Sequence, residues 1–138
     1  MDGKRFRTSS AVTAAALMLL TLAVFSVLQD YGPESAIRRF RDAVRRMDGR
    51  ALAAVTEEPL DDPRVTHLVQ AVKALDESGA SYQILRMDRE PRRVAAEVLY
   101  TLPDGRQGQT WWIVVKSRRA WRVEARETGR AFRQTLGL

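Results

Sequence analysis

The stretch TWWIVVKSRRAW, residues 110–121, shapes the fold more than any other part of the chain. Its β-branched and aromatic residues flank a short polar turn at Ser117-Arg118-Arg119, which is the pattern of a β-hairpin. A strand sends neighbouring side chains to opposite faces, so Trp111 and Trp112 cannot both enter one core. The sequence therefore predicts one buried and one outward-facing tryptophan.

The length of the hairpin loop decides which tryptophan is buried. A three-residue loop pairs Val115 with Trp121 and, further from the loop, Trp111 with Ala125, and it makes one face wholly apolar. A two-residue loop would instead pair Lys116 with Trp121 and mix the two faces. We therefore predict the three-residue loop, with Trp111 in the core.

The opposite face of this hairpin would then expose an aromatic patch made of Trp112, Val114 and Arg122. Tryptophan and arginine are frequent anchors of protein interfaces, and exposed apolar patches often mark such interfaces. We expect a partner protein or a second copy of the chain to cover this patch. The alternative is that a neighbouring arginine side chain lies over the exposed ring.

Upstream of the hairpin, the apolar period changes from helical to strand-like at Gly79. A stripe of Ile37, Phe40, Val44 and Met47 predicts a first helix, and Asp62-Pro63 predicts the start of another. The expected elements are a helix from Pro33 to Asp48, a short helix over 51–56, a helix over 63–78, and strands over 82–87, 94–102, 109–116 and 120–127. Residues 129–138 form a short helix or a loose tail. The class is α+β, with two or three helices packed on one face of an antiparallel sheet of about four strands, all within residues 32–128.

The segment AVTAAALMLLTLAVFSVL, residues 11–28, carries no charge. At about 1.5 Å per residue it is long enough to cross the hydrocarbon core of a bilayer, so we expect a retained transmembrane helix. The alternative is a signal peptide cleaved after Ser26, which would release a secreted domain. Residues 1–10 form a basic tail, which places the N-terminus inside. The five arginines between Arg38 and Arg46 lie within 20 residues of the membrane and favour the opposite orientation, but we expect them to belong to a folded helix and not to a loose loop. The protein would then be a single-pass protein of the inner (cytoplasmic) membrane, with its domain in the periplasm or outside.

The chain has 138 residues, no cysteine and a single histidine, His67. Disulfides, thiolate sites and multi-histidine metal sites are therefore excluded. His67 lies nearly opposite the apolar stripe of its helix, so we expect it to be solvated. Tyr82 and Tyr100 are the only polar residues that we expect to face inward. We predict no catalytic residue, no cofactor and no metal site.

Five arginines on the first helix of the domain form the densest charge feature: Arg38, Arg39, Arg41, Arg45 and Arg46. They begin about ten residues after the predicted anchor. This cluster can contact anionic lipid headgroups or an acidic partner at the membrane surface. The alternative is an ordinary solvated helix face. Nucleic acid is not expected as a partner, because a membrane-tethered domain outside the cytoplasm carries no recognisable reader motif.

Two stretches resemble the nuclear transport factor 2-like (cystatin-like, SnoaL-like) superfamily. FRDAVRRMDGRALAAV resembles its opening helix, Asp-Gly turn and second helix. LPDGRQGQTWWIVVKSRRAWRVE resembles its last hairpin through Asp104-Gly105, Val114-Val115-Lys116 and Trp121-Arg122-Val123. The resemblance covers roughly residues 33–127 and implies a bent sheet wrapped around a helix, like a cone with a pocket at its open end. It carries no catalytic residue over to this chain.

Three functions are consistent with these features. The first is a non-enzymatic accessory or assembly subunit that binds other subunits of a bacterial membrane complex, such as a secretion, respiratory or photosynthetic complex. The second, implied by the resemblance, is a cone-pocket binder of small molecules or an enzyme of the ketosteroid isomerase type. The third is a secreted version of either domain.

Overall fold

The computed structural model describes residues 3–29 and 32–138, with side chains for residues 10–23 and 32–138. The chain divides into two units, residues 1–32 and 33–138. In the first unit, helix α1 (Gly3–Gln29) is continuous over 27 residues. Within the described part of the chain, no helix is both long enough and apolar enough to cross a membrane. The expected span, residues 11–28, extends over residues 24–28, whose side chains lie outside the described part.

Three helices open the second unit: α2 (Pro33–Arg46), α3 (Gly49–Val55) and α4 (Pro63–Glu77). Ile37, Phe40 and Val44 of α2 are buried, as their spacing predicts. Met47 is not part of that stripe, because the helix ends before it: Met47 has a φ of 53° and its side chain is 80% exposed. The backbone NH of Asp48 donates to the carbonyl of Ala43 and closes the helix end.

Both later helices begin at an aspartate that caps them. The Asp48 carboxylate accepts a hydrogen bond from the backbone NH of Ala51, and the Asp62 carboxylate accepts one from that of Arg64. Such side chains satisfy NH groups that have no partner inside the helix. The predicted start of α4 at Asp62-Pro63 is thus confirmed.

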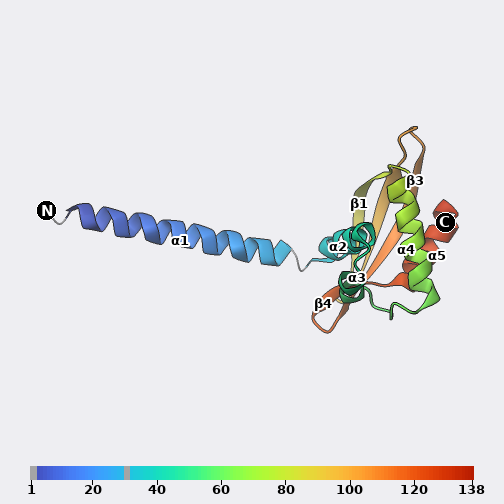
Figure 1. Ribbon diagram of the computed structural model, residues 1–138, viewed down its shortest axis with the longest axis horizontal. Helices are drawn as coiled ribbons and strands as arrows, with labels where there is room; N and C mark the ends of the chain where they lie inside the picture. Colours follow the sequence, from blue (N-terminus) through green and yellow to red (C-terminus); the bar gives the residue numbers. More distant parts are fainter. Residues whose placement is uncertain (1–2, 30–31) are drawn as a thin grey trace. The chain divides into compact units, whose positions relative to one another are not determined.

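Four strands follow: β1 (Ser81–Arg89), β2 (Arg93–Thr101), β3 (Gln107–Ser117) and β4 (Ala120–Val123). They form one antiparallel sheet in the order β1-β2-β3-β4, so the predicted α+β class is confirmed (Figure 1). The turn at Asp104-Gly105 joins β2 to β3, and Gly105 supplies the positive φ of 90° that it needs.

The predicted register of the last hairpin is wrong. Its loop has two residues, Arg118 and Arg119, and β3 pairs with β4 through Ser117 with Ala120 and Val114 with Val123. Both loop residues have positive φ, 49° and 68°, as in the tight turns whose twist matches that of a β-hairpin. This register turns Trp112, instead of Trp111, toward the helices.

The chain leaves the sheet after Val123 and forms a fifth helix, α5 (Ala125–Leu136). The expected strand over 120–127 is therefore four residues too long, and residues 129–138 are mostly helical. Ala125, Thr128, Gly129 and Phe132 are the buried residues of α5. A β-carbon at Gly108 of β3 would lie 2.5 Å from Leu136 Cδ2, so a larger residue there would require the Leu136 side chain to move. Figure 1 shows α5 running beside α4.

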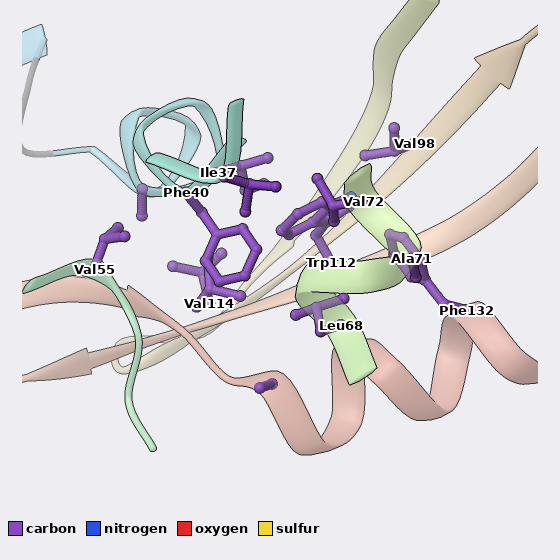
Figure 2. Close-up of a cluster of buried hydrophobic side chains, with 14 of the residues drawn as sticks. Ile37, Phe40, Val55, Leu68, Ala71, Val72, Val98, Trp112, Val114 and Phe132 are labelled. Atoms are coloured by element: carbon purple, nitrogen blue, oxygen red, sulfur yellow. The ribbon is translucent and has the colours of Figure 1, made fainter. Parts of the chain in front are cut away.

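Helices α2, α4 and α5 meet the same face of the sheet. Figure 2 shows Phe40 of α2, Leu68 of α4 and Phe132 of α5 around Trp112. These four side chains are 0% exposed. The core of the domain is therefore centred on the tryptophan that the sequence analysis placed outside.

Candidate functional site

Aromatic rings fill the interior of the domain between the helices and the sheet. The Trp112 ring packs edge-to-face against Phe40 and Phe132, with centroids 5.5 Å and 5.4 Å away. Its Nε1 donates a hydrogen bond of 3.0 Å to the Tyr100 hydroxyl. Tyr100 is 4% exposed, and burial raises the pKa of its hydroxyl to about 12, so this group is neutral at physiological pH.

Few other polar side chains lie in this interior. Besides Tyr100, the buried polar residues of the described part are Ser35, Thr56, Thr110 and Thr128, and none of these titrates near neutral pH. The Thr128 hydroxyl accepts a hydrogen bond from the backbone NH of Ile113 and so joins α5 to β3. Tyr82 is half-buried beside Tyr100, with ring centroids 6.3 Å apart. Within residues 3–29 and 32–138, no group of three or more acidic or histidine side chains is placed to hold a metal ion.

The surface of the domain carries several shallow hollows. One of about 350 Å³ lies where α4, α5 and the β2–β3 turn meet, and Tyr100, Leu102 and Leu136 line part of it. Another, of about 410 Å³, is lined mainly by charged side chains around Glu58 and Glu124. A third, of about 370 Å³, lies between α2 and α4 and is mostly apolar.

The five arginines of α2 have different surroundings in the structure. The Arg41 guanidinium lies 3.6 Å from the centre of the Tyr82 ring, over the sheet. Arg45 forms an ion pair of 2.8 Å with Asp76 of α4. Arg38, Arg39 and Arg46 are exposed, and together with Arg45 they give α2 a basic surface opposite its buried stripe. The sequence predicted the cluster but not this division.

The structure does not support the predicted interface patch. Trp112 and Val114 are 0% exposed, because the two-residue hairpin loop turns them toward the helices. Arg122 is half-buried, and its Nε has no hydrogen-bond partner among the described residues. Trp111 takes the outward position, and the Arg86 guanidinium lies 5.5 Å from its ring centre. The alternative prediction, an arginine side chain over the outward-facing tryptophan ring, named Trp112. The structure shows this arrangement at Trp111 instead.

His67 is half-buried instead of solvated. Its Nε2 lies 3.2 Å from the backbone oxygen of Leu138. The prediction failed because α5 and the residues after it cover this side of α4, and the sequence analysis left that helix open.

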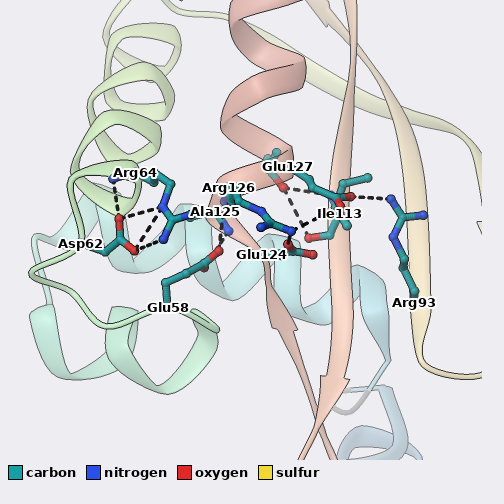
Figure 3. Close-up of polar contacts among 10 residues, drawn as sticks. Glu58, Asp62, Arg64, Arg93, Ile113, Glu124, Ala125, Arg126 and Glu127 are labelled. Carbon is teal, nitrogen blue, oxygen red and sulfur yellow. Dashed lines mark hydrogen bonds and ion pairs between the residues drawn. The ribbon is translucent and has the colours of Figure 1, made fainter.

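Sequence analysis missed an important role of Glu58. Its carboxylate accepts hydrogen bonds from the backbone NH groups of Ala125 (2.8 Å) and Arg126 (3.0 Å), the first residues of α5 (Figure 3). Glu124, at the cap position of this helix, makes no capping hydrogen bond of its own. A carboxylate at a helix N-terminus also stabilises the helix dipole. Glu58 thus replaces the missing local cap from 67 residues away.

We expect Glu58→Ala to lower the free energy of unfolding by about 1–2 kcal/mol, as the loss of a helix cap does. Urea denaturation of the full chain, followed by circular dichroism, measures this change. The control is Glu57→Ala, an exposed neighbour of the same charge, which should change stability by less than about 0.5 kcal/mol. Equal effects of the two substitutions would argue against the capping role.

Glu124 makes the stability of the domain depend on pH. Burial raises the pKa of its carboxyl above the ordinary value of 4.5, and the charges of Glu127 and Glu58 raise it further. The folded state therefore binds a proton more tightly than the unfolded state does. This contribution to stability is present below the ordinary pKa and is lost as the pH rises through the raised one.

We therefore expect Glu124→Gln to be more stable than the native chain at pH 7–8, with a gap that closes as the pH falls toward 4. Thermal unfolding of both chains across this pH range measures the gap. A gap that stays constant with pH would show that the carboxyl does not titrate as inferred.

The geometry of the domain agrees with a known structure. A crystal structure of a Campylobacter jejuni protein, named as a candidate NTF2-like transpeptidase, superimposes with a TM-score of 0.52. The match covers 67% of this chain and 97% of that one, at 16% sequence identity. No family of known proteins and no curated protein matches the sequence. The chain therefore has a nuclear transport factor 2-like fold, and at this identity the similarity shows the fold alone.

Proposed function

We propose that this chain is a single-pass membrane protein whose folded domain binds other proteins and catalyses no reaction. It would act as an accessory or assembly subunit of a membrane complex. One observation supports the non-enzymatic part of this proposal: the rings of Trp112, Phe40, Phe132 and Tyr100 fill the interior in which an enzyme of this fold would hold its substrate. Acid–base catalysis needs titratable groups whose environments separate their pKa values, and the buried polar residues of the described part do not supply such a pair.

The proposed anchor rests on the sequence and on the extent of α1. Residues 11–28 carry no charge, and they lie within the helix that runs from Gly3 to Gln29. Lys4, Arg5 and Arg7 precede the apolar run, which favours an N-terminus in the cytoplasm. The domain would then lie in the periplasm or outside the cell. A secreted domain after signal cleavage is the alternative for this part of the chain.

The absence of cysteine makes a direct test of the anchor possible. Single cysteines at Thr8→Cys and Asp61→Cys can be labelled in intact cells with a membrane-impermeant maleimide. Asp61 is exposed in the domain, so we expect labelling there in intact cells, and at position 8 only after permeabilisation. The reverse pattern would overturn the orientation. Recovery of the chain from the soluble fraction after alkaline washing would overturn the anchor.

The hollow bounded by Tyr100, Leu102 and Leu136 favours a second candidate, a binder of small apolar molecules. Purification of the full chain from its native membrane in mild detergent, followed by mass spectrometry, separates the two functions. Stoichiometric copurification of another membrane protein supports the accessory role. A small molecule that is retained by the native chain and lost from Leu102→Trp would overturn it in favour of the second candidate.

A further inference from the structure

We propose that the exposed basic surface of α2 docks the domain on anionic lipid headgroups of the membrane that holds α1. This inference rests on the proposed membrane anchor and names a contact that the domain would make beyond it. The surface consists of Arg38, Arg39 and Arg46 of α2, continued by Met47 and Arg50. All five side chains are exposed.

The charge of this surface fits a lipid surface of opposite sign. Helix α2 contains five arginines and two acidic residues, Glu34 and Asp42, so it carries a formal charge of +3. Asp76 of α4 offsets one of these positive charges through its ion pair with Arg45. The Arg39 Nε donates a hydrogen bond of 3.4 Å to the backbone carbonyl of Ser35, and the Arg46 Nε donates one of 3.4 Å to that of Asp42. Within the described part of the chain, these two side chains make hydrogen bonds only to their own helix. Guanidinium groups of this kind pair readily with phosphate oxygens.

The length of the chain keeps α2 near the proposed anchor. Only residues 30–32 separate Gln29, the last residue of α1, from Pro33, the first residue of α2. Four residue steps span at most about 14 Å even when fully extended. Arg38 and Arg39 follow within the second turn of α2. The tether is therefore short enough for the basic surface to reach the bilayer surface, where the negative potential of anionic lipids acts over about 8 Å.

Met47 adds an apolar group between two of the cations. It is 80% exposed, and the positive φ at this residue marks the end of α2. Arg46 precedes it and Arg50 follows it three residues later. Apolar side chains beside basic ones are typical of segments that lie in the headgroup region of a membrane.

Each arginine near an anionic membrane surface strengthens docking by roughly a factor of five in the equilibrium constant. Replacing Arg38, Arg39 and Arg46 together by glutamine should therefore weaken docking by up to about a hundredfold. Salt at 0.5 M should weaken it as well, because it shortens the range of the attraction to a few ångströms.

The test uses the full chain, labelled with a fluorescent donor at Asp61→Cys, an exposed position far from the anchor in sequence, and reconstituted into vesicles that carry an acceptor lipid. Energy transfer is compared between phosphatidylcholine vesicles and vesicles containing 30% phosphatidylglycerol. We expect transfer to rise in the anionic vesicles, to fall again in 0.5 M salt, and to stay low in the triple Arg38, Arg39, Arg46→Gln variant. Vesicle flotation after alkaline extraction, in both vesicle types, reports separately whether the anchor is inserted.

The matched control removes three exposed arginines elsewhere, Arg118, Arg130 and Arg133→Gln, and should leave the energy transfer unchanged. If the chain floats with the vesicles but transfer does not depend on phosphatidylglycerol, docking is overturned while the anchor stands. If the chain does not float, the proposed anchor itself has failed. A triple Arg38, Arg39, Arg46→Gln variant that loses a copurifying acidic protein but keeps its energy transfer would overturn lipid docking in favour of a protein partner.

Discussion

Replacing Trp112 by alanine is expected to lower the free energy of unfolding by about 3–5 kcal/mol, the range found for large aromatic side chains removed from a core. The indole ring is 0% exposed and lies between Phe40 and Phe132. Its loss would also leave the buried Tyr100 hydroxyl without the Nε1 donor. Urea denaturation of the full chain in mild detergent, followed by circular dichroism, measures the change without relying on tryptophan fluorescence.

The neighbouring Trp111→Ala is the matched control, because it removes the same side chain from the same strand. Trp111 is half-buried on the other face, with Arg86 over its ring, so we expect a cost of about 1 kcal/mol. The register inferred from sequence predicts the opposite order of the two effects. A larger loss at Trp111 than at Trp112 would restore that register.

Phe132→Ala should also cost about 3–5 kcal/mol, although Phe132 lies only six residues before the last residue of the sequence. Its ring is 0% exposed and packs edge-to-face with Trp112 and with Tyr100, at 5.4 Å and 6.1 Å. The same denaturation experiment measures this change. Arg133→Ala, at the next and exposed position, should cost less than about 0.5 kcal/mol. If both substitutions were equally mild, α5 would be the loose tail that the sequence left open.

The elements that sequence analysis predicted well are those with one apolar face. Ile37, Phe40 and Val44 recur at helical spacing among charged residues, so only one orientation of α2 buries them. Val94, Ala96, Val98 and Tyr100 alternate with more polar neighbours and are buried on β2 as expected. Strand β3 is apolar on both faces, so its alternation does not indicate which face is inside. The two-residue turn decides which face of β3 is inside. It places two arginines at positive φ, where glycine or asparagine would be expected.

The C-terminal helix and its cap show a second limit. The spacing of a buried helix face is present in Ala125, Thr128, Gly129 and Phe132. Just before them, however, Trp121 and Val123 alternate as in a strand, and the predicted strand was extended too far, to residue 127. The role of Glu58 could not be predicted, because its partner lies 67 residues away and no local pattern indicates it. The arginine cluster is the part of the candidate site that the sequence predicted. Its division between Tyr82, Asp76 and solvent depends on elements that pack beside α2.

The Glu58 cap has a consequence for the order in which the domain assembles. The β2–β3 and β3–β4 hairpins join neighbouring segments, so they close short loops at a small entropic cost. The bonds from Ala125 and Arg126 to Glu58 close a loop of 67 residues, and contacts of such long sequence separation tend to form late. We expect the first turn of α5 to be secured only after the sheet has formed. Glu58→Ala would then accelerate unfolding and leave the refolding rate nearly unchanged, a φ-value near 0 in stopped-flow kinetics.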